Sequence, residues 1–163
     1  MKECIYPGSF DPVTLGHLNI MERASRLFDR VIVGVLNNPR KKNLFSADQR
    51  VELIKQATKS IPNLEVCKFN GLLADFARQR NCSVILKGIR SVEDFEYEKD
   101  MALCNQKLYP ALETVILNTH PKYSCVSSSA VRDILYFKGD LTGFVPDEVK
   151  ENIQQIYKMN MGE

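Results

Sequence analysis

The sequence predicts an α/β fold: a single-domain, Rossmann-like, doubly wound parallel sheet of five strands with further helices near the C-terminus. Three observations support this prediction. Five short apolar runs alternate along the chain with segments in which apolar residues recur at helical spacing. Most runs end at glycine, proline or polar residues, where a connection to a helix is expected. The 163 residues suit one domain with one hydrophobic core.

The predicted strands are continuous apolar runs, as expected for strands that are buried on both faces of a parallel sheet. Residues 31–36 (VIVGVL) form such a run and are rich in β-branched side chains. The other strands are expected at 4–6, 64–69, 83–86 and 114–117.

The predicted helices follow recognisable start signals. Ser46 and Gln49 form a capping-box pattern, and Ser91 precedes a long helical segment that Pro110 closes. Pro146 stands at a first helical position with acidic residues behind it. Apolar residues at helical spacing cover 20–28, 51–61, 72–77, 95–108, 130–137 and 149–156.

Composition limits the classes of partner. The chain has 44% hydrophobic and 26% charged residues, which is ordinary for a folded globular protein. Its 22 basic and 20 acidic residues give a net charge of +2, too balanced for bulk binding of nucleic acid or a membrane surface. The longest apolar runs fall far short of the roughly 20 residues that span a bilayer.

The five cysteines show no C-x-x-C pair and no zinc-ligand spacing. We expect buried or half-buried free thiols, as in a reducing compartment. Residues 1–3 lack a signal-peptide pattern, so a cytoplasmic location is expected.

The connection between the first strand and the first helix carries an unusual set of residues. In YPGSFDPVTLGH (6–17), proline, glycine, a hydroxyl, an aromatic ring and a histidine all lie within one strand-to-helix connection. Helix N-termini at this edge of an α/β sheet bind anions through free N–H groups and the helix dipole. His17 is therefore a candidate site residue, although it could also be a solvated residue of the first helical turn.

Basic residues follow several other strands. The run 40–42 follows the second strand, residues 87–90 follow the fourth, and 120–129 follow the fifth. No carboxylate lies just past the second or fourth strand, so the cations are expected on one rim, as in a polyphosphate site. Separately, each has a plainer interpretation: a solvated loop for 40–42, a turn for 87–90 and a helix N-cap for the serine triplet 127–129.

Two common nucleotide motifs are missing. The sequence has no G-x-x-x-x-G-K-[ST], which excludes a P-loop enzyme, and no G-x-G-x-x-G, which disfavours a dinucleotide redox cofactor. A nucleotide held by T-x-G-H and a basic rim suggests chemistry at a different phosphate.

Four segments together resemble the bacterial phosphopantetheine adenylyltransferases of the T/H-x-G-H nucleotidyltransferase superfamily. They are YPGSFDPVTLGH (6–17), the run 40–42, LKGIRSVEDFEYE (86–98) and VSSSAVR (126–132). T-x-G-H alone marks only the superfamily, whereas residues 88–98 with the serine triplet are much more specific. The likeness covers nearly the whole chain, in the same order and with similar spacing.

The resemblance implies transfer of AMP from ATP to 4′-phosphopantetheine, which yields dephospho-coenzyme A and pyrophosphate in coenzyme A biosynthesis. It implies Mg²⁺ held mainly by the ATP phosphates, without a protein metal site, and a homo-oligomer that is usually a hexamer. ATP and 4′-phosphopantetheine are the implied partners; neither nucleic acid nor a membrane is expected.

Roles for individual residues are also implied by the resemblance. His17 would stabilise the transition state, acting with Lys41 and Arg90 as the catalytic group. ATP contacts are implied for Ser9, Phe10, His17, Gly88, Ile89, Arg90, Glu98, Tyr123, Ser124, Cys125, Val126, Ser127, Ser128 and Ser129. Contacts to phosphopantetheine are implied for Ser9, Lys41, Leu73 and Lys87.

The chemistry agrees with a site built of cations and hydrogen-bond donors. The nucleophile is a phosphate whose second pKa is near 6, so it is largely dianionic at neutral pH and needs no general base. The obstacle is bringing two anions into line. Lysine at 87, where the family commonly has arginine, keeps the charge but loses the bidentate fork, and serine at 9 keeps the hydroxyl of the common threonine.

Three alternatives remain open from the sequence. The first is another small adenylyl- or cytidylyltransferase of the superfamily that uses nicotinamide mononucleotide or a phosphorylated alcohol. The second is a non-catalytic adenine-nucleotide sensor, which needs the phosphate cradle but no second anion site. The third is a flavodoxin-like interaction module, for which the rim cations would be incidental.

Overall fold

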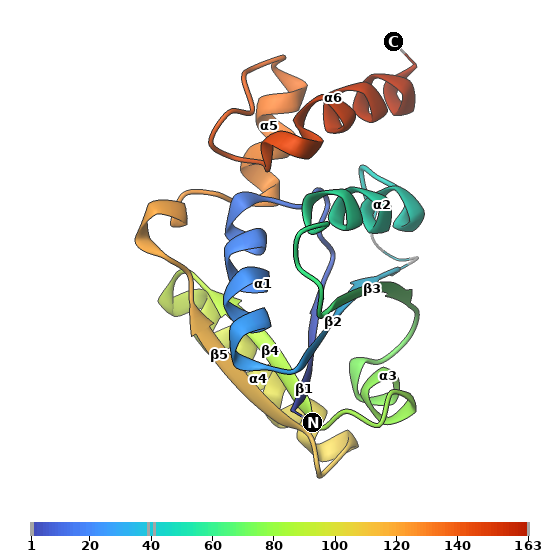
Figure 1. The fold of residues 1–163 in the computed structure, drawn as a ribbon, viewed down its shortest axis with the longest axis vertical. Helices are drawn as coiled ribbons and strands as arrows, with labels where there is room; N and C mark the ends of the chain where they lie inside the picture. The colour runs from blue at the N-terminus through green and yellow to red at the C-terminus, as the bar shows by residue number, and fades with distance from the viewer. Residues whose placement is uncertain (1, 39, 41, 163) are drawn as a thin grey trace.

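A computed structural model describes residues 2–38, 40 and 42–162 of the chain. Within these residues a five-stranded parallel sheet has the order β3-β2-β1-β4-β5 (Figure 1). The strands are β1 (Glu3–Gly8), β2 (Arg30–Leu36), β3 (Leu64–Phe69), β4 (Val84–Ile89) and β5 (Glu113–Asn118). The helices are α1 (Leu15–Leu27), α2 (Ala47–Ala57), α3 (Leu73–Gln79), α4 (Val92–Leu108), α5 (Ser128–Tyr136) and α6 (Asp147–Met161), with a short 3₁₀ helix at Pro121–Tyr123.

The sheet is covered on both faces, which confirms the predicted doubly wound class. Alternate strand residues divide the core into two clusters, since successive side chains of a strand point to opposite faces. Cys4 and Tyr6 pack with apolar residues of α1, α2, α5 and α6, whereas Ile5 packs with residues of α3. α5 and α6 lie past the upper end of the sheet in Figure 1, and α6 packs against α2. None of the helices in the described residues is long and apolar enough to cross a membrane.

Two predicted strand ends were wrong. β1 continues through Pro7 to Gly8, and β4 continues through Lys87 to Ile89, so several residues expected in loops lie in strands. Pro7 is tolerated because β1 is still in register with β2 there, where Pro7 lies opposite Gly34. Between β1 and β4, the described residues pair only at Ile5 and Ile85. A missing N–H at Pro7 therefore interrupts no ladder on the β4 side.

The separation of β1 from β4 also creates the crevice of the fold. The strand order reverses direction at β1. On one side of β1 lie β2 and then β3, and on the other side lie β4 and then β5. Ligands of open α/β sheets bind at such a switch point, outside the carboxyl ends of the strands. The fold therefore places any ligand site between Gly8 and the end of β4.

The cysteine prediction was wrong in part. Cys4 and Cys82 are buried and Cys67 is half-buried, but Cys104 and Cys125 are exposed. All five are free thiols, and burial raises the pKa of the Cys4 thiol to about 12. Cys4 is thus a packing residue rather than a nucleophile.

Candidate active site

A cavity of about 560 Å³ lies at the switch point between β1 and β4. Its wall combines β1 and its following loop, the start of α1, the end of β4, one side of α4 and the start of α5. Predicted site residues that line it are Ser9, Phe10, His17, Leu73, Lys87, Gly88, Arg90, Glu98, Val126, Ser127, Ser128 and Ser129. Four others, Ile89, Tyr123, Ser124 and Cys125, are not among the lining residues, and Lys41 lies outside the described residues.

His17 lies in the first turn of α1 and is held in place by the N-cap of that helix. Thr14 is the N-cap of α1, and its side chain accepts a hydrogen bond from the His17 N–H at 3.3 Å. In return, His17 Nδ1 accepts the Thr14 backbone N–H at 3.1 Å. This reciprocal pair is a capping box with histidine at the position where Glu or Gln is usual. A backbone amide can only donate, so the His17 proton must reside on Nε2.

The His17 ring is neutral over the physiological range. Burial is the main cause and the positive charge of Arg90 the second; together they lower the pKa of His17 to about 4. Nε2 is therefore an N–H donor with no protein partner among the described residues, on a side chain that lines the cavity. Such a group can stabilise an oxyanion, but its low pKa makes it a poor general base near neutral pH.

We expect this state to be visible by NMR in the His120→Gln variant, where His17 is the only histidine left. The ¹⁵N shifts should report the Nε2–H tautomer unchanged down to about pH 5, because the folded pKa is about 4. A ring that titrates near pH 6.5 would contradict the assignment.

The same pKa shift affects folding stability. Between pH 6.5 and about 4 the unfolded chain binds a proton at His17 that the folded chain does not. The free energy of unfolding therefore falls as pH falls through this window, by at most about 3.4 kcal/mol. His17→Gln should lack this component.

Phe10 packs against the ring of His17. Its side chain is 2% exposed, and its ring meets those of Tyr6 and His17 edge to face, with centroids 5.4 Å and 5.0 Å away. Phe10 takes a left-handed φ of 47°, and Gly8 makes room for the ring, since a Cβ there would lie 2.9 Å from Phe10 Cζ. The tight turn after β1 thus places an aromatic wall against His17.

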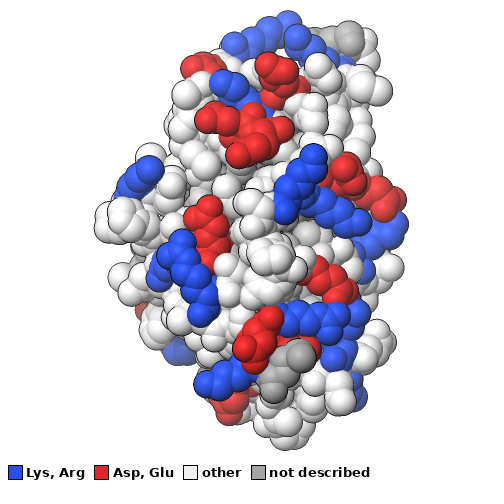
Figure 2. All heavy atoms as spheres, in the orientation of Figure 1, with Lys and Arg blue, Asp and Glu red and all other residues white. Residues whose placement is uncertain are grey.

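Lys87 in β4 and Arg90 just after it are both paired with acids, which corrects the expectation of a rim without carboxylates. Lys87 Nζ lies 3.0 Å from Glu98 Oε2, and Arg90 Nε lies 3.3 Å from Asp94 Oδ2. Both acids belong to α4, beyond the residues just past the strand ends. Figure 2 likewise shows both signs of charge interspersed over one face of the molecule. Anions that enter this site would have to compete with α4 for Lys87 and Arg90.

The serine triplet begins α5 and lines the cavity. Ser127 is the N-cap of α5 and accepts the Ala130 N–H at 3.0 Å, so the plainer interpretation is correct for this residue. Ser128 Oγ donates to the Pro12 carbonyl at 2.9 Å, which ties the start of α5 to the loop that follows β1. All three serines nevertheless line the cavity.

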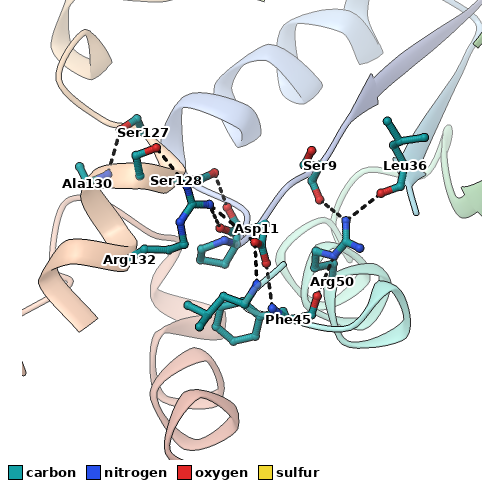
Figure 3. Close-up of polar contacts among 12 residues, drawn as sticks. Ser9, Asp11, Leu36, Phe45, Arg50, Ser127, Ser128, Ala130 and Arg132 are labelled. Atoms are coloured by element: carbon teal, nitrogen blue, oxygen red, sulfur yellow. Dashed lines mark hydrogen bonds and ion pairs between the residues drawn. The ribbon is translucent and has the colours of Figure 1, made fainter. Parts of the chain in front are cut away.

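Sequence reasoning missed three charged residues behind the cavity, namely Asp11, Arg50 and Arg132. Asp11 is 4% exposed and Arg50 is 1% exposed. Figure 3 shows the polar contacts of all three residues. Arg50 occupies an ordinary helical position and gives no sequence signal, since its partners are backbone carbonyls far along the chain. Asp11, within 6–17, and Arg132, at the end of 126–132, lay in segments already singled out, but neither was assigned a role.

A family comparison agrees with this fold and site. The family described as "Cytidylyltransferase-like" matches residues 5–134, and the chain is a nucleotidyltransferase. More particularly, it belongs to the phosphopantetheine adenylyltransferase family, which confirms the resemblance noted in the sequence.

Relatives match over nearly the whole chain. The phosphopantetheine adenylyltransferase of Caldanaerobacter subterraneus subsp. tengcongensis is 54% identical over 158 residues, which cover 97% of this chain and 99% of the relative. That of Clostridium botulinum is 53% identical over 155 residues, which cover 95% and 94%.

Solved structures with low sequence identity share the fold. A protein of Vibrio parahaemolyticus, assigned as a nicotinate-nucleotide adenylyltransferase, has a TM-score of 0.64 at 17% identity and covers 94% of this chain and 99% of its own. A bifunctional NMN adenylyltransferase/ADP ribose pyrophosphatase of Francisella tularensis has a TM-score of 0.74 at 16% identity over 99% of this chain and 53% of its own. Both likenesses concern the fold alone.

Proposed function

We propose that this chain transfers the adenylyl group of ATP to 4′-phosphopantetheine, which yields dephospho-coenzyme A and pyrophosphate. The observation that carries the proposal is identity above 50% to phosphopantetheine adenylyltransferases over nearly the full chain. The cavity supports it, because it places a neutral histidine, two cations and four serines around one space.

The reaction suits groups that stabilise charge rather than move protons. The acceptor phosphate is largely dianionic at neutral pH and attacks the α-phosphate directly. His17 Nε2–H would donate to an α-phosphate oxygen as charge builds on it, with Arg90 beside it. Ser9, Lys87 and Leu73 would contact the acceptor, and the serine triplet with Glu98 would contact ATP. Lys41 is proposed to hold phosphates, on the resemblance alone.

Mg²⁺ is proposed as the cofactor. Among the described residues, no group of three or more His, Cys, Asp or Glu side chains could hold a metal ion. The cavity does offer Asp94 and Glu98, and Mg²⁺ usually binds substrate phosphates with at most one or two carboxylates and keeps several waters. The residues thus fit an ion that arrives with ATP and neutralises phosphate charge when bound.

The direct test is incubation with ATP, Mg²⁺ and 4′-phosphopantetheine while pyrophosphate release is measured. We expect release that depends on the acceptor, with dephospho-coenzyme A identified by mass. Release only with nicotinamide mononucleotide or a phosphorylated alcohol would assign another superfamily reaction. ATP binding without release under any acceptor would indicate a sensor. The hexameric state, also a proposal, is tested by the solution mass.

The Lys87–Glu98 pair gives a prediction about the acceptor. Glu98→Gln removes the negative charge that lies 3.0 Å from Lys87 Nζ, so the acceptor phosphate no longer competes with it. We expect the KM for 4′-phosphopantetheine to fall by about threefold to tenfold, while the KM for ATP rises because Glu98 contacts ATP.

Steady-state kinetics with each substrate varied in turn measure this split. Glu96→Gln is the matched control, because Glu96 is exposed on the same helix and does not line the cavity. An acceptor KM that stays constant or rises in Glu98→Gln would show that Lys87 is not held back by its carboxylate.

A further inference from the structure

Asp11 joins the β1–α1 connection, which lines the cavity, to the residues just before α2. It lies in the loop between β1 and α1, and its carboxylate accepts the N–H groups of Leu44 and Phe45 at 2.8 Å and 2.9 Å (Figure 3). Those two residues belong to the segment 37–46, which leads from β2 to α2 and carries the basic run 40–42. One buried carboxylate therefore fixes Leu44 and Phe45 against the loop that leads to His17.

Arg50 makes the complementary connection through carbonyl groups. Its Nη1 donates to the carbonyl oxygens of Ser9 and Leu36, at 2.7 Å and 3.0 Å. Its Nε lies 3.1 Å from the carbonyl of Phe45 and 3.3 Å from that of Ser46. Arg50 thereby joins the ends of β1 and β2 to the start of α2 (Figure 3).

Arg132 adds the third connection. From α5, its Nη1 donates to the Asp11 carbonyl at 2.8 Å and lies 3.6 Å from Asp11 Oδ2. Its Nη2 donates to Ser129 Oγ at 3.1 Å. The serine segment at the start of α5 is thus tied to the same residue that holds Leu44 and Phe45.

This arrangement is costly as a way to stabilise a fold. Arg50 is 1% exposed, its Nη2 has no partner among the described residues, and burial lowers the pKa of its guanidinium. Taking a charged guanidinium out of water costs free energy, which hydrogen bonds to neutral carbonyl groups only partly offset. What a guanidinium and a carboxylate add is directional hydrogen bonding to several backbone groups at once.

We propose that Asp11, Arg50 and Arg132 form a positioning cluster that sets two connections of the cavity wall in the geometry that adenylyl transfer requires. None of the three lines the cavity, so they act through other residues. The two connections are the β1–α1 loop with Ser9 and His17 and the start of α5 with the serine triplet. Leu44 and Phe45, just before α2, anchor the first of them through Asp11. In-line attack of one anion on another is sensitive to such placement, since a misplacement of about 1 Å can lower a rate about 100-fold.

The proposal rests on the proposed function, and Asp11→Asn tests it. Asparagine keeps the size of the side chain but turns an NH₂ toward the N–H groups of Leu44 or Phe45, so one of those bonds is lost. We expect kcat to fall about 100-fold while both KM values change much less, because the substrates still bind but are misaligned.

Glu65→Gln is the matched control. Glu65, near the start of β3, accepts hydrogen bonds from Arg30 and Arg80 and does not line the cavity. The same carboxylate-to-amide change there should lower the Tm without lowering kcat by more than about twofold. If Glu65→Gln loses as much kcat as Asp11→Asn at equal loss of Tm, the cluster is merely structural and the proposal is overturned.

If Asp11→Asn does not fold, Arg132→Met is the second variant that tests the proposal. The Arg132 side chain is 39% exposed, so its loss is easier to tolerate. We expect about a tenfold lower kcat, partly restored in Arg132→Lys, which can still donate to the Asp11 carbonyl. Wild-type kcat in Arg132→Met, at a temperature where the variant is folded, would overturn the proposal. A wild-type chain that releases no pyrophosphate would instead refute the proposed function.

Discussion

Replacing His17 with alanine is expected to lower kcat by about 100- to 1,000-fold while ATP affinity changes little. The reason is the timing of the interaction. The His17 Nε2–H is a neutral donor, and its hydrogen bond strengthens only as charge develops on the α-phosphate. Ground-state ATP is bound mainly by other groups, so its affinity depends less on this residue.

Binding and turnover must be measured separately to test this. ATP binding by calorimetry gives Kd, and pyrophosphate release gives kcat, in the wild-type chain and in His17→Ala. His120→Ala is the matched control, because this exposed histidine does not line the cavity. Equal losses of affinity and turnover would instead indicate a structural role for His17 or a sensor.

Replacing Arg90 with alanine should lower kcat/KM for ATP by about 100-fold or more, through both kcat and KM. Arg90 lines the cavity and is close enough to His17 to lower its pKa, so its charge acts on the same phosphates in the ground and transition states. Its side chain is 37% exposed, so a ligand can reach it, but a phosphate must compete with Asp94, which lies 3.3 Å from its Nε.

Steady-state kinetics check this effect, with Arg26→Ala as the control, since Arg26 is exposed on α1 and does not line the cavity. Arg90→Lys should recover part of the loss because it keeps the charge without the fork. The pKa of His17 should rise in Arg90→Ala but stay below 6.5, because burial is the larger cause of its shift. A wild-type kcat/KM in Arg90→Ala would remove Arg90 from the catalytic group.

Several site residues were predictable because their signals are local. His17 follows a strand and a tight turn within one short segment, and Arg90 follows the next strand that lines the crevice. Asp94 and Glu98 also lie in the GIRSVEDFEYE segment, yet their pairing with Arg90 and Lys87 depends on how α4 crosses β4. Arg50 had no signal at all, since its carbonyl partners Ser9 and Leu36 are brought to it only by the sheet.

The sequence alone determined the α/β class, the strand order in the chain, the first turn of α1 and the family, because periodicity, capping patterns and motif spacing act over a few residues. The tertiary structure decided the remainder. It set the separation of β1 from β4 after Ile5, the neutral state of His17 and the pairing of rim cations with α4. These features depend on burial and on contacts between distant segments, and neither is defined until the sheet and its helices have packed together.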